Sequence, residues 1–136
     1  MQRMGAGIAA LRYRPVWLAV GYVLVGLTAW FSLDNSPPRW AFVAGDKVLH
    51  AATYGLLVYW FGQLYPGARR RAGVVIAFIA FGGLMEVFQA WFTVVRDPQI
   101  GDFVADTVGT LTALGLLATP AGRLIECIDG WLSPGR

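Results

Sequence analysis

Residues 72–95 read AGVVIAFIAFGGLMEVFQAWFTVV, an apolar run that Glu86 and Gln89 interrupt. A helix needs about 20 mainly apolar residues to cross a bilayer, and this run meets that requirement. The dipeptide Asp97-Pro98 follows it, and a proline there stops the helix from continuing. The stretch therefore predicts a transmembrane helix that carries an acid and an amide inside the hydrocarbon layer.

Further apolar segments lie on both sides of this run. Helix breakers separate them, at residues 36–38, 66–67 and 120. After Pro120 an amphipathic pattern typical of a membrane-surface helix places apolar residues at helical spacing, namely Leu124, Ile125, Ile128, Trp131 and Leu132. We predict an all-α polytopic membrane protein, a single domain over residues 1–136. Its four transmembrane helices would cover residues 15–33, 46–65, 72–95 and 102–119, and its short C-terminal amphipathic helix residues 121–132.

The composition agrees with a membrane protein. Hydrophobic residues make up 57% of the chain and charged residues 14%, with a mean hydropathy of +0.55, whereas soluble domains carry about 25% charged residues. The net charge is +3, but the basic residues sit in short clusters between apolar segments. This distribution indicates membrane topology, and no nucleic-acid partner is expected.

The basic clusters also predict the orientation. Lys and Arg favour the cytoplasmic side of a membrane. Three segments that would share one side hold most of them, namely Arg3, Arg12 and Arg14, then Arg69, Arg70 and Arg71, and finally Arg123 and Arg136. The other side has Arg39, Lys47 and Arg96, each near an acid. Both termini should therefore be cytoplasmic in a multi-pass protein.

Polar side chains form one stripe on each of three predicted helices. At about 1.5 Å of rise per residue, all of them fall in the outer half of the bilayer. The stripes consist of Asp46, Lys47, His50 and Tyr54, of Glu86 and Gln89, and of Asp102 and Asp106, with Arg96 at the outer end of the third helix. An ionisable group that faces lipid costs about 2.5–3.5 kcal/mol. We therefore expect the stripes to converge inside the bundle.

Plainer roles exist for most of these residues. Asp46 and Asp102 could be helix caps, and Lys47 and Arg96 could extend to the interface. His50 and Tyr54 could simply pack. Glu86 differs, because buried intramembrane acids are usually functional.

Glu86 should also have a partner. The expected donors are His50, Tyr54, Gln89 or Lys47, while Arg96 could pair with Asp102 or Asp106. The glycines at 82, 83, 109 and 115 are expected to permit close helix contact.

These residues carry a family resemblance. The pattern Asp46-Lys47-x-x-His50-x-x-x-Tyr54-x-x-Leu57 resembles the first signature of VanZ-like membrane proteins. Glu86-x-x-Gln89, Arg96, Asp102 and Asp106-x-x-Gly109 resemble the second. The resemblance implies a bacterial inner (cytoplasmic) membrane protein of the cell envelope. The family's namesake is associated with low-level resistance to the glycopeptide teicoplanin, and the resemblance implies no established reaction. The family often has asparagine where this chain has Asp106, which weakens any role that needs an amide there.

Three functions compete. The first is binding or remodelling of an anionic lipid-linked molecule, with Lys47, His50 and Arg96 near its phosphate and a possible effect on glycopeptide susceptibility. Expected partners are membrane lipids, a lipid-linked cell-wall precursor or a glycopeptide. The second is a membrane-embedded hydrolase or transferase with His50 and Glu86 as acid and base. The third is a structural or accessory subunit.

Two further questions stay open from the sequence. No standard metal motif is present, and the cofactor is unknown. A divalent cation could still bind the acids and His50 through oxygen and imidazole. Four short helices also leave lateral surface for a homo-oligomer.

Overall fold

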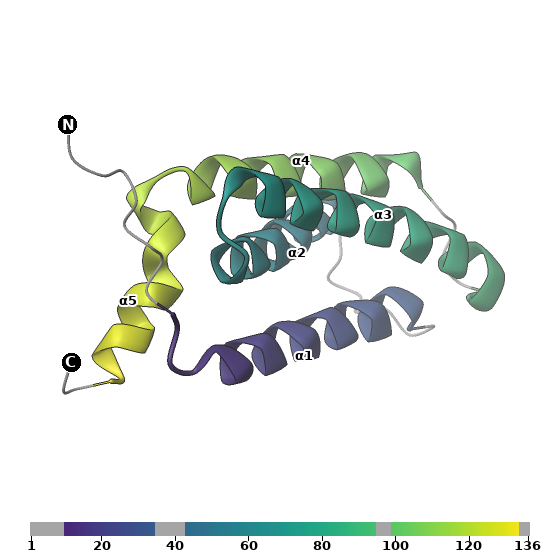
Figure 1. Cartoon of the computed structure of the whole chain (residues 1–136). Coiled ribbons are helices and arrows are strands. Elements are labelled where there is room, and N and C mark those ends of the chain that lie inside the picture. Colours follow the sequence, from purple (N-terminus) through teal and green to yellow (C-terminus); the bar gives the residue numbers. More distant parts are fainter. Residues whose placement is uncertain (1–9, 35–42, 95–98, 134–136) are drawn as a thin grey trace.

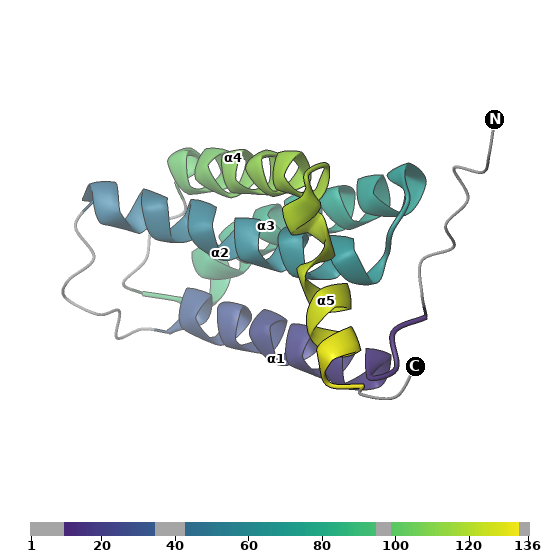
Figure 2. The same ribbon diagram turned by 90° about the vertical axis from the view of Figure 1, so that its left-hand side faces the viewer.

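The computed structural model describes residues 10–34, 43–94 and 99–133, and in these ranges all regular structure is helical (Figure 1). The helices are α1 (Arg14–Leu33), α2 (Val43–Leu64), α3 (Ala68–Phe92), α4 (Ile100–Leu117), a 3₁₀ turn η1 (Pro120–Arg123) and α5 (Leu124–Trp131). The all-α prediction is confirmed. The long helices run alternately up and down, and α5 lies across one end of the bundle (Figure 2).

The helix boundaries differ from the predicted ones by a few residues. Helix α3 starts earlier than residue 72 because Gly67 makes the turn, with a φ of 99° that only glycine adopts readily. Arg69, Arg70 and Arg71 are therefore helical, not part of a loop. Helix α3 ends at Phe92, where Thr93 is extended.

Helix α2 packs tightly against α4. A Cβ added at Gly109 would lie 1.9 Å from the carbonyl oxygen of Ala51, and one at Gly55 would lie 3.1 Å from the carbonyl oxygen of Gly109. Small residues at such crossings let helix backbones approach closely in membranes. The prediction for Gly109 is confirmed. The same prediction is wrong for Gly115, where an added Cβ would meet nothing within 4 Å.

The apolar core forms where α2 meets α3 and α4. It contains Tyr54, Leu57, Val58, Phe61, Val75, Phe78, Ala113 and Leu117. Helix α1 is more peripheral, and the residues it buries are Gly21 and Ser32. Its outer face is apolar, with Val23 and Trp30 largely exposed, as expected for a helix that faces lipid.

Three helices, α1, α3 and α4, are long and apolar enough to cross a membrane. The prediction of four such helices is therefore confirmed for three. Helix α2 has 22 residues but is too polar by composition, because it carries Asp46, Lys47, His50 and Gln63. All four of these side chains meet other helices or the groove beside α1.

Helix α5 closes one end of the bundle. The buried carboxylate of Asp129 accepts hydrogen bonds from the backbone N–H groups of Arg12 and Tyr13 and from Nε1 of Trp17, at 2.8–2.9 Å. Ile125 is also buried, and its N–H donates to Oε1 of Gln63. Asp129 is not one of the apolar residues that define the amphipathic pattern, so this buried contact was not predicted from the sequence. Exposed apolar residues of α5 are Leu124, Ile128 and Trp131, and Leu132 directly after the helix is also exposed.

Candidate functional site

A polar cluster lies at the end of the bundle opposite α5, where α2 begins beside the start of α4. Lys47 on α2 forms an ion pair with Asp102 on α4. The Lys47 ammonium also donates to Oε1 of Gln99, at 3.0 Å. One third of the Lys47 side chain stays exposed, while that of Asp102 is 8% exposed. The stripes of α2 and α4 therefore converge as expected.

His50 lies between the two aspartates of α4. Its Nδ1 is 2.9 Å from Oδ1 of Asp106, a hydrogen-bond distance. Its Nε2 is 3.7 Å from Oδ2 of Asp102, which is too long for a hydrogen bond. With Asp106 ionised, its carboxylate only accepts, so Nδ1 would be the donor, and a neutral imidazole would then have its lone pair on Nε2. Asp106 therefore holds the ring in one orientation.

Gly82 on α3 makes room for this arrangement. A Cβ added there would lie 3.0 Å from Oδ2 of Asp106 and 3.3 Å from Cε1 of Tyr54. Any other residue would crowd the carboxylate that orients His50. The expected close contact at Gly82 is thus present, and it serves the cluster directly.

Glu86 has a different partner from the predicted ones. Its Oε2 accepts a hydrogen bond of 2.9 Å from the backbone N–H of Gln99, just before α4. The side chain is half-buried and borders a separate hollow that it shares with Gly83, Gln99, Ile100 and Phe103. A carboxylate at a helix N-terminus is favourable, so Glu86 ties α3 to the start of α4.

Gln89 lies outside the cluster. It is 2% exposed, and its Nε2 donates to the carbonyl oxygen of Ser32 at the end of α1, at 3.0 Å. This hydrogen bond joins α3 to the end of α1, and the binding role of Gln89 stays a prediction. Tyr54 is also 2% exposed and packs against Phe81. Arg96 lies outside the described residues.

Gln99 is the residue that sequence reasoning missed. Its side chain accepts from Lys47, and its backbone N–H donates to Glu86. It occupies the position just before Ile100, the first residue of α4. A residue directly before a helix has a backbone N–H that can donate to a nearby carboxylate. This position before a helix was the one feature of the sequence that could have identified Gln99.

An apolar groove between α1 and α2 opens beside the cluster. It has a volume of about 360 Å³, within the range of about 300–1,000 Å³ of small-molecule sites. Asp46 and His50 border it. Most other lining residues are apolar, including Leu24, Leu27, Phe31, Leu49, Leu56 and Leu57. The groove thus has a polar end and an apolar wall, and α1 covers it only loosely.

Comparisons with protein-family models, curated proteins and solved structures found no match. The resemblance to VanZ-like proteins therefore stays a prediction that rests on the motif residues.

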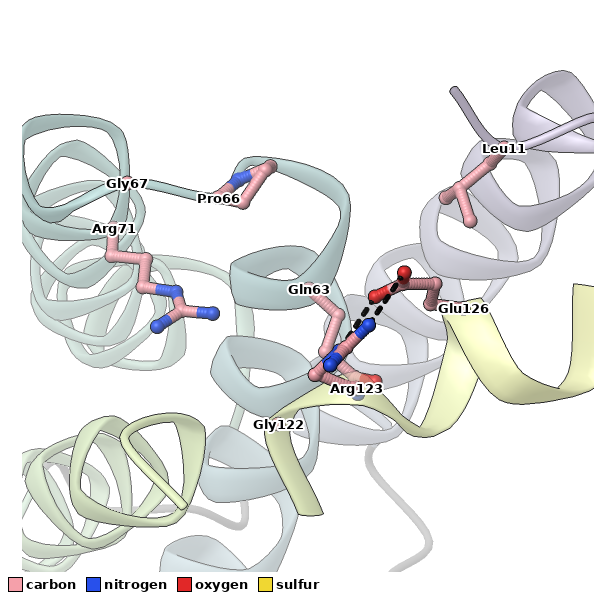
Figure 3. Close-up of a pocket in the computed structure, with 8 residues that line it drawn as sticks. All are labelled: Leu11, Gln63, Pro66, Gly67, Arg71, Gly122, Arg123 and Glu126. Carbon is pink, nitrogen blue, oxygen red and sulfur yellow. Dashed lines mark hydrogen bonds and ion pairs between the residues drawn. The ribbon is translucent and has the colours of Figure 1, made fainter. Parts of the chain in front are cut away.

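A smaller hollow lies at the α5 end, with a volume of about 260 Å³ (Figure 3). Arg71 points into it while donating to the carbonyl oxygens of Gly62 and Leu117. Arg123 forms a two-bond ion pair with Glu126, and the guanidinium holds the pKa of Glu126 below its ordinary value. Both arginines already have partners within the chain, so this hollow is a structural junction where α2, α3, η1 and α5 meet.

Proposed function

We propose that this protein binds an anionic, lipid-linked molecule of the cell envelope, with the polar head at the α2–α4 cluster and the hydrocarbon tail in the α1–α2 groove. The observation that carries the proposal is that His50 and Asp46 belong to both features. They face the α4 aspartates on one side and border the apolar groove on the other. An amphiphile with a charged head fits this combination.

The membrane placement is part of the proposal. Helix α2 would span the bilayer with the other three, because its ends are level with theirs. Lys47 meets Asp102 at the start of α4, and Arg71 at the start of α3 binds Gly62 near the end of α2. Neighbouring helices shield the polar side chains of α2 from lipid. Inward-facing ionisable residues are the usual arrangement in membranes.

The orientation follows from the basic residues. Described arginines gather at the α5 end, at positions 12, 14, 69, 70, 71 and 123. By the positive-inside rule this end is cytoplasmic, together with both termini. The cluster then lies in the outer half of the membrane. The VanZ-like motifs support a bacterial inner membrane and make glycopeptide susceptibility a phenotype to measure.

The head group would meet Lys47 first. Its ammonium is the most exposed of the charged groups in the ion pairs of the cluster, and an ammonium is a common phosphate binder. The tail would lie along the apolar part of the groove wall, where Leu27, Leu49 and Leu56 are partly exposed. Because a lipid tail in the bilayer is already out of water, these contacts would act through van der Waals packing and not through the hydrophobic effect.

Native mass spectrometry of the protein purified from membranes tests this proposal. We expect the wild type to retain a lipid and Leu27→Trp, which fills the groove, to lose it. Val23→Trp is the matched control, because Val23 lies one turn away on α1, is 61% exposed and does not line the groove. Equal lipid retention by the two tryptophan variants would contradict binding in the groove.

A membrane-embedded hydrolase or transferase acting on a lipid-linked phosphate is a second candidate. The hydrogen bond between His50 and Asp106 favours it, because a histidine held this way can take a proton at Nε2. In the earlier hypothesis Glu86 was the partner acid, but its bond to Gln99 points it to a different hollow. Turnover of an added lipid pyrophosphate that is lost in His50→Ala would favour this function over binding alone.

A further inference from the structure

The charge of the cluster opposes an anionic head group. In the described residues, the carboxylates of Asp46, Asp102 and Asp106 outnumber the ammonium of Lys47 and the imidazole of His50. Like charges that face each other in a medium of low dielectric constant repel strongly. Among the described residues, an added positive charge at this place would therefore favour the binding of a phosphate.

The geometry offers a place for that charge. One donor atom each from Asp46, His50 and Asp102 lie within 4.8 Å of one another. The 3.7 Å between Nε2 of His50 and Oδ2 of Asp102 exceeds a hydrogen-bond length, yet one ion could contact both atoms at about 2.0–2.2 Å. The ion pair of Lys47 occupies only Oδ1 of Asp102, which leaves Oδ2 for a ligand.

Asp106 is not one of the three candidate ligands, but it contacts His50 and orients its ring. Its Oδ1 lies 2.9 Å from Nδ1 of His50, so in a neutral imidazole that donates to an ionised Asp106 the lone pair is on Nε2, the nitrogen that faces Asp102. Histidines that bind metal ions almost always donate their other N–H to a carboxylate, a carbonyl or water. The Asp106 side chain is 3% exposed, so this positioning contact is well shielded from water.

We propose that Asp46, His50 and Asp102 bind one divalent transition-metal cation, and that Asp106 is a positioning residue for His50. Two carboxylates and one imidazole suit Mn²⁺ or Zn²⁺ better than Mg²⁺, because a nitrogen ligand favours transition metals. The cation adjoins the groove and adds positive charge beside a phosphate head bound there. This last role rests on the proposed lipid-binding function, whereas cation binding itself does not.

Mn²⁺ binding to the full chain tests the site directly. The protein is purified in a phosphate-free detergent, dodecyl maltoside, and free Mn²⁺ is followed by its EPR signal. We expect one bound ion per chain and at least tenfold weaker binding in Asp46→Asn and in His50→Ala. Asp106→Asn should weaken binding by about 10–100-fold, as for other partners of metal-binding histidines. Glu126→Gln, far from the cluster, is the control and should bind like wild type.

Two results would overturn the cation site. One is a folded wild-type protein that binds no Mn²⁺, and the other is binding that persists unchanged in Asp46→Asn. Asp46 is half-buried and asparagine has nearly the same shape, so this variant gives an answer even where His50→Ala fails to fold. Circular dichroism of each variant confirms that its helices are present.

A second experiment, which measures lipid binding, distinguishes failure of the cation site from failure of the proposed function. Binding of phosphatidylglycerol is measured with Mn²⁺ and with EDTA. Lipid binding that needs Mn²⁺ supports both proposals. Equal lipid binding in EDTA overturns the role of the cation and leaves the lipid proposal standing. Mn²⁺ binding without any lipid binding supports the cation site and contradicts the proposed function.

Discussion

His50 on α2 and Asp106 on α4 lie 2.9 Å apart, from Nδ1 to Oδ1, although 56 residues separate them in the chain. This contact joins the two most closely packed helices at the level of the polar cluster. With Nδ1 of His50 directed at Asp106, Nε2 is the ring nitrogen that remains for a ligand of the cluster. The packing that enforces this contact, the attachment of α5 and the membrane orientation each lead to a separate prediction.

Gly109→Ala should destabilise the protein by about 1–3 kcal/mol, the usual cost of overpacking a core. The new methyl group would lie 1.9 Å from the carbonyl oxygen of Ala51, so α2 and α4 must separate. Gly115→Ala is the matched control on the same helix. It meets nothing within 4 Å and should be neutral or gain up to about 1 kcal/mol of helix propensity. Thermal unfolding in detergent measures both, and similar effects of the two substitutions would argue against the tight crossing.

Asp129→Ala should release the start of α1 from α5. It removes the acceptor for three donors, the N–H groups of Arg12 and Tyr13 and Nε1 of Trp17. Hydrogen bonds to a charged group contribute about 1.5–3 kcal/mol each, so a loss of at least about 2 kcal/mol is expected. Hydrogen exchange at residues 12 and 13 should rise with it. Glu126→Ala, on the same short helix, should leave those amides protected.

The prediction for pH concerns Glu126. Its hydrogen bond to Arg123 and the nearby positive charge hold its pKa below the ordinary value of 4.5. A lowered pKa in the folded state means that the pair stabilises α5 above about pH 4.5, and that this contribution disappears as the pH falls through the lowered value. In Arg123→Ala the pKa should return to the ordinary range. NMR titration of the Glu126 carboxyl carbon measures it, and an unchanged pKa would show that the pair does not form in solution.

The single cysteine gives a direct test of orientation. Cys127 is exposed on α5, so it reports on which side the α5 end lies. A membrane-impermeant maleimide should label it in inverted inner-membrane vesicles and not in intact spheroplasts. Labelling in spheroplasts would place the α5 end outside and reverse the proposed topology. Cys127→Ser is the control for non-specific labelling.

The sequence was enough to locate the helices, because their signals are local. The run at 72–95 and the breakers at 66–67 and 120 mark apolar segments and their ends without reference to the rest of the chain. The meeting of α2 and α4 was also predictable, since Asp106 and His50 are too costly to expose to lipid. These arguments use only spacing along one helix and the cost of burial.

The partners of individual side chains were not predictable in the same way. Glu86 binds the backbone N–H of Gln99, and Gln89 binds the end of α1 at Ser32. The prediction was instead that His50, Tyr54, Gln89 or Lys47 would donate to Glu86. A helical stripe shows which face is polar, but it does not show which neighbour lies opposite each residue. The buried role of Asp129 was missed for the same reason, because it depends on how α5 folds back onto α1.

The central claim is that the cluster and the groove together hold one amphiphile. An experimental structure of the chain in nanodiscs that contain anionic lipid tests it most directly. We predict elongated density between α1 and α2, in contact with Leu27 and Leu56, that ends in a head group beside Lys47 and His50. A closed groove without density, or a His50 ring turned out toward bulk lipid and away from Asp106, would contradict the account.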